Sequence, residues 1–158
     1  MSNVRNFIDA IRYPINHRLD LDVVRASGQH TLRTHIAKVI EKYAIDAVID
    51  VGANEGEFGS NLRKAGFKGE VYSFEPVAGA FKELSQLAKD DGKWTVHDCA
   101  LGAKEGNAEI NVSEFSQFSS LLNANDYGNS NWNSMKVEHR QKIKIETLDN
   151  CFKKGLIH

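Results

Sequence analysis

The stretch that decides the fold is Asp46-Ala-Val-Ile-Asp50-Val-Gly52-Ala-Asn54-Glu-Gly56-Glu-Phe58-Gly59. Its apolar run from Ala47 to Val51 is interrupted by a single acid and then gives way to glycines. Beyond the glycines, apolar residues return with helical spacing at Phe58, Leu62 and Ala65. The stretch therefore predicts a buried parallel strand, a tight turn and the start of a helix. Such a turn lies at the carboxyl edge of an open α/β sheet, where ligands bind.

The glycines of this turn have a definite physical use. Gly52 and Gly56 permit a positive φ and let a ligand approach the backbone without a Cβ in the way. Asp50, at the end of the strand, is placed to hold hydroxyl or amino groups of that ligand. The dinucleotide fingerprint G-x-G-x-x-G does not fit, because its second and third glycines would fall on Asn54 and Glu57. A Walker loop is excluded as well, and a tight connection without a ligand is the alternative.

A second acid supports a ligand at this edge. Glu70 to Phe74 has the pattern of a strand and ends at Glu75-Pro76, and Glu75 follows Gly56 by 75 − 56 = 19 residues. An acid about 20 residues beyond the turn, at the tip of the second strand, is where a carboxylate grips a ribose diol. The two features together predict a nucleoside-type ligand.

Three segments together resemble the FkbM family of methyltransferases. They are Val48-Ile-Asp50-Val-Gly52-Ala-Asn54-Glu-Gly56-Glu-Phe58-Gly59, Val71-Tyr-Ser-Phe-Glu75-Pro76 and Ala100-Leu-Gly102, and the resemblance runs from about Leu32 to Leu148. It implies the doubly wound, mostly parallel α/β sheet of the Rossmann-like class I methyltransferase fold. It also implies S-adenosylmethionine as cofactor and O-methylation of a small-molecule or sugar hydroxyl.

The resemblance assigns the cofactor site residue by residue. Asp50 and the glycine turn would form the methionine and ribose side, and Glu75 would hold the ribose hydroxyls. Asp98, with Cys99 and Ala100, would border the adenine, and a solvated loop acid is the alternative for Asp98. No general base is assigned, since the candidates His97 and His139 have no visible orienting partner. The expected cofactor-binding residues are Asp50, Gly52, Ala53, Asn54, Gly56, Phe58, Glu75, Pro76, Asp98, Cys99 and Ala100.

Further helices and strands follow from the periodicity of the chain. Helical stripes are expected at Leu32, Ile36, Val39, Ile40 and Tyr43, with Thr31 as N-cap, and at Phe81, Leu84, Leu87 and Ala88 within a helix from Val77 to Lys89. The helix that begins at Glu57 should end at Gly66, and Lys93 to Ala100 is expected to form the third strand. This β-α-β-α-β series predicts strand order 3-2-1 with helices on both faces.

The later part of the chain changes character. Ala108 to Val112 and Lys142 to Thr147 alternate as an added antiparallel strand pair around the polar segment from Ser116 to Ser134. Within that segment, Ser119 or Ser120 would donate a hydrogen bond to cofactor or acceptor, and a surface insertion is the alternative.

Two regions are expected, residues 1–30 as an N-terminal helical arm or lid and residues 31–158 as the S-adenosylmethionine-binding domain. The resemblance implies that this domain is truncated at its C-terminus, before the fourth strand of the family fold. We therefore expect Lys142 to Thr147, or a second copy of the chain in a homodimer, to cover the open edge of the first strand. A non-catalytic cofactor-binding or interaction module is the alternative function.

The composition limits the other classes of function. The 158 residues suit one domain, and a net charge of −1 with interspersed charges argues against nucleic acid or an anionic membrane as the main partner. The resemblance implies a small-molecule or saccharide acceptor instead. His30 and His35 lack companions for a metal site. Cys99 and Cys151 are too few for a disulfide framework, which favours a reduced, cytoplasmic protein.

Overall fold

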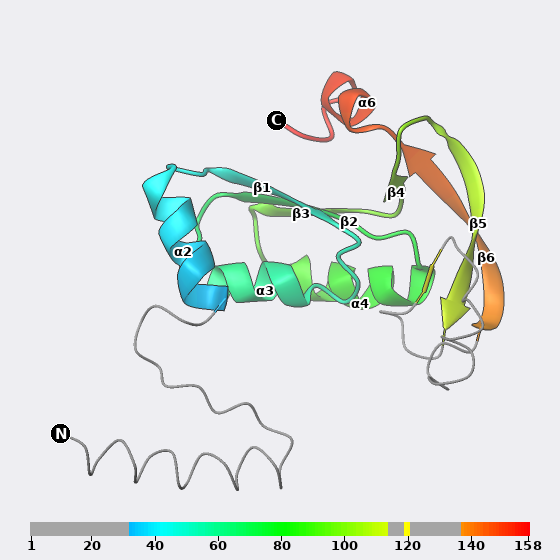
Figure 1. Cartoon of the computed structure of the whole chain (residues 1–158), viewed down its shortest axis with the longest axis horizontal. Coiled ribbons are helices and arrows are strands. Elements are labelled where there is room, and N and C mark those ends of the chain that lie inside the picture. Colours follow the sequence, from blue (N-terminus) through cyan, green and yellow to red (C-terminus); the bar gives the residue numbers. More distant parts are fainter. Residues whose placement is uncertain (1–31, 114–118, 121–136) are drawn as a thin grey trace, which may run out of the picture.

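A parallel sheet of three strands forms the centre of the computed structural model, which describes residues 32–113, 119–120 and 137–158 (Figure 1). Its strands are β1 (Ala47–Val51), β2 (Glu70–Phe74) and β3 (Trp94–His97), in the order β1-β2-β3. Both pairs are parallel, and Val71 of β2 lies opposite Val48 on one side and Trp94 on the other. The first two predicted strands and the strand order are confirmed.

Three helices cover one face of this sheet. They are α2 (Leu32–Lys42), α3 (Glu57–Lys64) and α4 (Ala78–Ala88). Ile36 and Ile40 of α2 pack against a core shared by all three helices and the sheet. The buried members of this core are Ala53, Leu62, Phe67, Val71, Leu84, Ala88 and Trp94.

Two apolar residues depart from their predicted helical stripes. Tyr43 is 65% exposed, because α2 ends at Lys42 and Tyr43 lies in the turn that follows. Leu87 is 49% exposed, although Leu84 and Ala88 of the same helix are buried as predicted. The predicted end of α3 is confirmed, since Gly66 follows the C-cap Ala65 with φ 94°.

The opposite face of the sheet carries α6 (Leu148–Lys153) and the C-terminal residues. Figure 1 shows α6 on the other side of the strands from α3 and α4. Cys151 of α6 packs in a second core with Tyr72, Phe74, Cys99 and Ile157. The predicted helices on both faces are therefore present, three on one face and, among the described helices, α6 alone on the other.

A second sheet holds β4 (Ala100–Leu101), β5 (Gly106–Ser113) and β6 (Val137–Glu146) in the order β4-β6-β5. β5 and β6 are antiparallel, which confirms the predicted strand pair and extends it. The prediction of one strand from Lys93 to Ala100 is wrong. The chain leaves the first sheet after His97 and enters the second at Ala100, because β4 pairs with the end of β6.

The expected cover for the open edge of β1 is also wrong in part. Within the described ranges β1 pairs with β2 alone, and Val51 at its end is 59% exposed. Lys142 to Thr147 does not reach this edge, because β6 lies between β4 and β5 and Thr147 is the N-cap of α6. Coverage by a second copy of the chain stays a prediction.

The two sheets meet at the start of α4. Val77 and Ala80 pack with Ile110, Val112 and Ile143 of β5 and β6 in a third buried cluster. This contact positions the second sheet beside the carboxyl edge of the first.

Several sequence predictions lie outside the described residues. They are the arm at residues 1–30, the Thr31 cap and most of the segment from Ser116 to Ser134. Within the described part of the chain, no helix has both the length and the apolar character that a membrane crossing requires.

Gly59→Ala should destabilise the fold, because a Cβ at this position would lie 2.2 Å from Cζ2 of the buried Trp94 ring. Overpacking of this kind costs about 1–3 kcal/mol. Gly79→Ala is the matched control, since Gly79 is also helical and a Cβ there meets nothing within 4 Å. Urea unfolding should show a lower midpoint for Gly59→Ala only, and equal midpoints would contradict the packing described here.

Glu146 should make stability depend on acid pH. Its buried carboxylate pairs with Lys144 Nζ at 2.5 Å and Lys154 Nζ at 2.8 Å, and these ammonium groups lower the pKa of Glu146 from 4.5 to about 2. A carboxylate whose pKa is lowered in the folded state stabilises the fold fully at pH values above its ordinary pKa of 4.5. This stabilisation is lost as the pH falls from 4.5 toward 2. The gap in urea midpoint between wild type and Glu146→Gln should therefore narrow from pH 6 to pH 3.

The matched control for this pH series is Glu109→Gln, because Glu109 is exposed on the same sheet. It should leave the midpoint close to that of wild type at both pH values. A gap for Glu146→Gln that stays constant across the series would refute the assigned pKa shift.

Candidate functional site

The turn between β1 and α3 has left-handed backbone at three positions. The φ angles are 73° at Gly52, 49° at Asn54 and 88° at Gly56, so the predicted positive φ of the two glycines is confirmed. The glycines serve different purposes, however. A Cβ on Gly52 would meet nothing within 4 Å, whereas one on Gly56 would lie 2.8 Å from Leu84 Cδ1 of α4. Gly52 therefore leaves open space beside the backbone, and Gly56 allows close packing of the turn on α4. Approach of a ligand to either glycine stays a prediction.

Backbone hydrogen bonds fasten this turn to the end of β2. The N–H groups of Gly52 and Ala53 both donate to the carbonyl of Phe74, at 2.9 and 3.1 Å. The turn is therefore held at the residue that immediately precedes the predicted ribose-binding acid, Glu75.

Glu75 joins the glycine turn to the start of α4. Its Oε2 accepts from the Asn54 N–H at 2.8 Å and its Oε1 accepts from the Val77 N–H at 2.7 Å. The residue is only 5% exposed, so these bonds offset the cost of taking the carboxylate out of water. A carboxylate has about four lone-pair sites, which leaves acceptor capacity on both oxygens for ligand hydroxyls.

Asp50 lies opposite Ser73 in the register of β1 and β2. The Ser73 hydroxyl donates to Asp50 Oδ2 at 3.3 Å and accepts from Trp94 Nε1 at 3.0 Å. Burial raises the pKa of Asp50, the bond from Ser73 opposes this rise, and the charge of Glu75 adds to it. The charge of Glu75 therefore acts on Asp50 across the carboxyl edge of the sheet.

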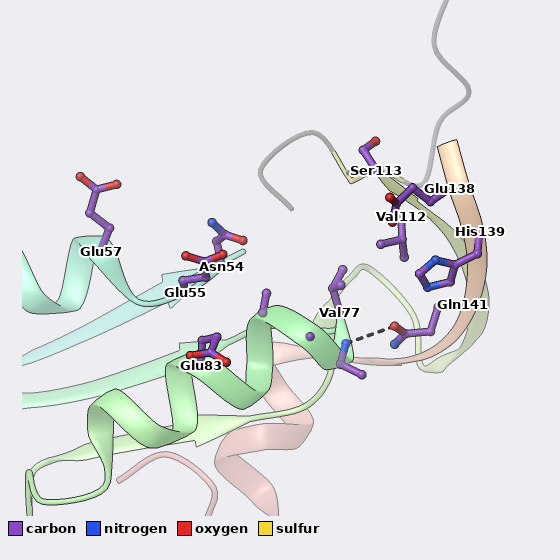
Figure 2. Close-up of a pocket in the computed structure, with 13 residues that line it drawn as sticks. Asn54, Glu55, Glu57, Val77, Glu83, Val112, Ser113, Glu138, His139 and Gln141 are labelled. Atoms are coloured by element: carbon purple, nitrogen blue, oxygen red, sulfur yellow. Dashed lines mark hydrogen bonds between the residues drawn. The ribbon is translucent and has the colours of Figure 1, made fainter. Parts of the chain in front are cut away.

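A cleft of about 670 Å³ opens between the turn, the start of α4 and the second sheet (Figure 2). The turn side includes Asn54, and the far wall includes Ser113 and His139. Acidic side chains line the cleft both on the side of the turn and helices and on the side of the second sheet. The full lining is Asn54, Glu55, Glu57, Val77, Ala78, Gly79, Ala80, Glu83, Val112, Ser113, Glu138, His139 and Gln141.

Gln141 is a site residue that the sequence interpretation missed. Its Oε1 accepts from the Ala78 N–H at 3.1 Å (Figure 2). Its Nε2 donates to the Pro76 carbonyl at 2.8 Å, so the side chain connects β6 to the start of α4. The available signal was its place on the same side of the alternating strand as the buried Ile143. A polar residue at an inward position needs a hydrogen-bonding partner.

The structure brings only part of the predicted site together. Asn54 lines the cleft, while Glu75 holds the backbones of two lining residues. Pro76 lies immediately before Val77, the N-cap of α4. Phe58, in the first turn of α3, is 39% exposed.

The three residues assigned to the adenine lie away from the cleft lining. Asp98 is exposed between β3 and β4. Cys99 is buried in the core on the α6 side of the sheet, and this burial raises the pKa of its thiol to about 11. Ala100 packs against the cluster that joins α4 to the second sheet. Their role toward an adenine stays a prediction.

Of the two histidines predicted as candidate bases, only one lines the cleft, and the two candidate serines bond to β5. His139 lines the cleft, whereas His97 stacks on Phe74 with 4.7 Å between ring centroids, and burial lowers the pKa of His97. The Ser119 hydroxyl accepts from the Ser113 N–H at 3.2 Å, and the Ser120 backbone pairs with Asn111. Neither serine is shown to serve a ligand.

The parallel sheet and its glycine turn define an α/β protein of the class that binds ligands at the carboxyl ends of its strands. The model of the methyltransferase FkbM domain matches residues 50–158, more than half of the chain. The chain belongs to the FkbM methyltransferase family. No match was found among curated proteins or among solved structures.

Glu75→Gln should lower stability, because the amide nitrogen of glutamine cannot accept from a backbone N–H. Either the Asn54 or the Val77 N–H would then lose its acceptor, at a cost of about 1–3 kcal/mol. Glu109→Gln, on the exposed side of β5, is the control. Chemical unfolding at pH 7 measures the difference, and an unchanged midpoint for Glu75→Gln would contradict the two bonds.

Proposed function

We propose that the chain is an S-adenosylmethionine-dependent methyltransferase of the Rossmann-like class I fold that methylates a hydroxyl oxygen of a neutral small molecule or saccharide. The observation that carries the proposal is the buried Glu75 carboxylate at the end of β2, bonded to the glycine turn. The family match supports methyl transfer as the class of reaction.

The residues at the turn fit this cofactor. Gly52 leaves open space beside the backbone, and Glu75 keeps acceptor capacity for the two ribose hydroxyls. Asp50 would hold the amino group of the methionine portion, with Asn54 at the border of the cleft. When bound, S-adenosylmethionine supplies an electrophilic methyl group, and the chain contributes mainly orientation.

The cleft supports an uncharged acceptor. Four of its lining residues are glutamates, Glu55, Glu57, Glu83 and Glu138, and such a surface disfavours phosphorylated or carboxylated molecules. Of the two histidines considered as a general base, His139 alone lines the cleft. Its place in the lining supports His139 as the candidate to accept the proton that a hydroxyl loses on methylation.

Calorimetric titration with S-adenosylhomocysteine tests the cofactor assignment. Wild type should bind with micromolar affinity, and Glu75→Ala should weaken binding by about tenfold or more, because charge-assisted bonds to the ribose contribute about 1.5–3 kcal/mol. Glu109→Ala removes an exposed carboxylate on the outer sheet and should bind as wild type does.

The outcomes separate the two functions considered for this chain. A folded wild type that does not bind S-adenosylhomocysteine would refute the cofactor assignment. Binding without release of S-adenosylhomocysteine, in assays with S-adenosylmethionine and a panel of neutral saccharides, would favour the non-catalytic module. Turnover with anionic acceptors only would contradict the role given to the cleft glutamates.

A further inference from the structure

The side chain of Gln141 acts on the backbone of α4 as a neighbouring strand would. In a parallel pair, one residue of a strand donates its N–H to the C=O of residue i of its neighbour and accepts with its C=O from the N–H of residue i+2. The Gln141 amide makes the same two bonds, to the Pro76 carbonyl and the Ala78 N–H. These partners also fix the orientation of the amide, because the first can only accept and the second can only donate.

Val77 lies between these two anchored residues, and its N–H has a different acceptor. Its N–H donates to Glu75 Oε1 at 2.7 Å, while the other carboxylate oxygen holds the Asn54 N–H. The hydrogen-bond donor to Oε1 therefore lies in a backbone segment that Gln141 bonds on both sides of Val77. The link runs from the second sheet, through residues 76–78, to the predicted ribose-binding carboxylate.

We propose that Gln141 is a positioning residue that aligns the Glu75 carboxylate for the ribose diol, so that cofactor binding senses the placement of the β5–β6 strand pair. This inference rests on the proposed function. Gln141 does not itself touch the ribose in this arrangement. It acts by holding Pro76 and Ala78, and through them the direction of the Val77 N–H.

The test compares two probes, S-adenosylhomocysteine and its 2′,3′-dideoxy analogue, by calorimetric titration. In wild type, removal of the diol should weaken binding by about tenfold or more, since it deletes hydrogen bonds to a charged group. Gln141→Met keeps the length of the side chain and removes both bonds. In this variant, removal of the diol from the probe should weaken binding by about threefold or less. The preference for the diol is the measured quantity.

The matched control is Arg140→Met, because Arg140 is an exposed neighbour on β6 that does not line the cleft. It should keep the wild-type preference for the diol. If Gln141→Met weakens both probes equally, or changes neither, Gln141 does not position Glu75 and the inference is overturned. If Gln141→Met does not fold, Gln141→Glu serves instead, since it keeps the acceptor for Ala78 and sets a carboxylate oxygen against the Pro76 carbonyl.

The design distinguishes failure of the inference from failure of the proposed function. Loss of affinity in Glu75→Ala, together with an unchanged diol preference in Gln141→Met, overturns the inference alone. A folded wild type that binds neither probe overturns the proposed function and this inference with it.

Discussion

The carboxyl edge of the sheet depends on the buried carboxylate of Glu75. A buried charge is tolerated only when hydrogen bonds replace its lost hydration, and here the replacements are the backbone N–H groups of Asn54 and Val77. The bond to Asn54 also holds a non-glycine residue in the left-handed region, at φ 49°. One side chain therefore fixes the turn after β1 and the entry to α4 at once.

At the amino ends of the strands, the cationic side chain of Arg63 has a comparable role. Arg63 of α3 pairs with Asp91 at 2.6 Å and donates to the carbonyls of Phe67, Gly69 and Lys93, so it connects the segments that enter β2 and β3. The pairing lowers the pKa of Asp91. Charged side chains bonded to the backbone thus fix the loops at both edges, while the space between them is filled by apolar packing on Trp94 and Leu84.

The part of this arrangement that the sequence predicts is local. Gly52 and Gly56 mark a turn because few other residues tolerate a positive φ, and Glu75 is identified by its spacing from that turn. The departures arise from contacts between distant segments. The break of the third strand after His97 depends on pairing of β4 with β6, and the exposure of Leu87 depends on which elements happen to cover α4. Gln141 belongs to the same group, since its partners lie 63 and 65 residues away.

The two buried or half-buried acids at the edge also determine which ligand charge is favoured there. Burial and the charge of Glu75 raise the pKa of Asp50, so an added cation would relieve repulsion and stabilise the ionised Asp50. The exposed glutamates of the cleft add to this field, but salt screens them more strongly than it screens the buried pair. Under the proposed function, the methyl donor carries a sulfonium charge that the product lacks. Ionised carboxylates at this edge would then attract the sulfonium of the donor, an interaction that the product cannot make.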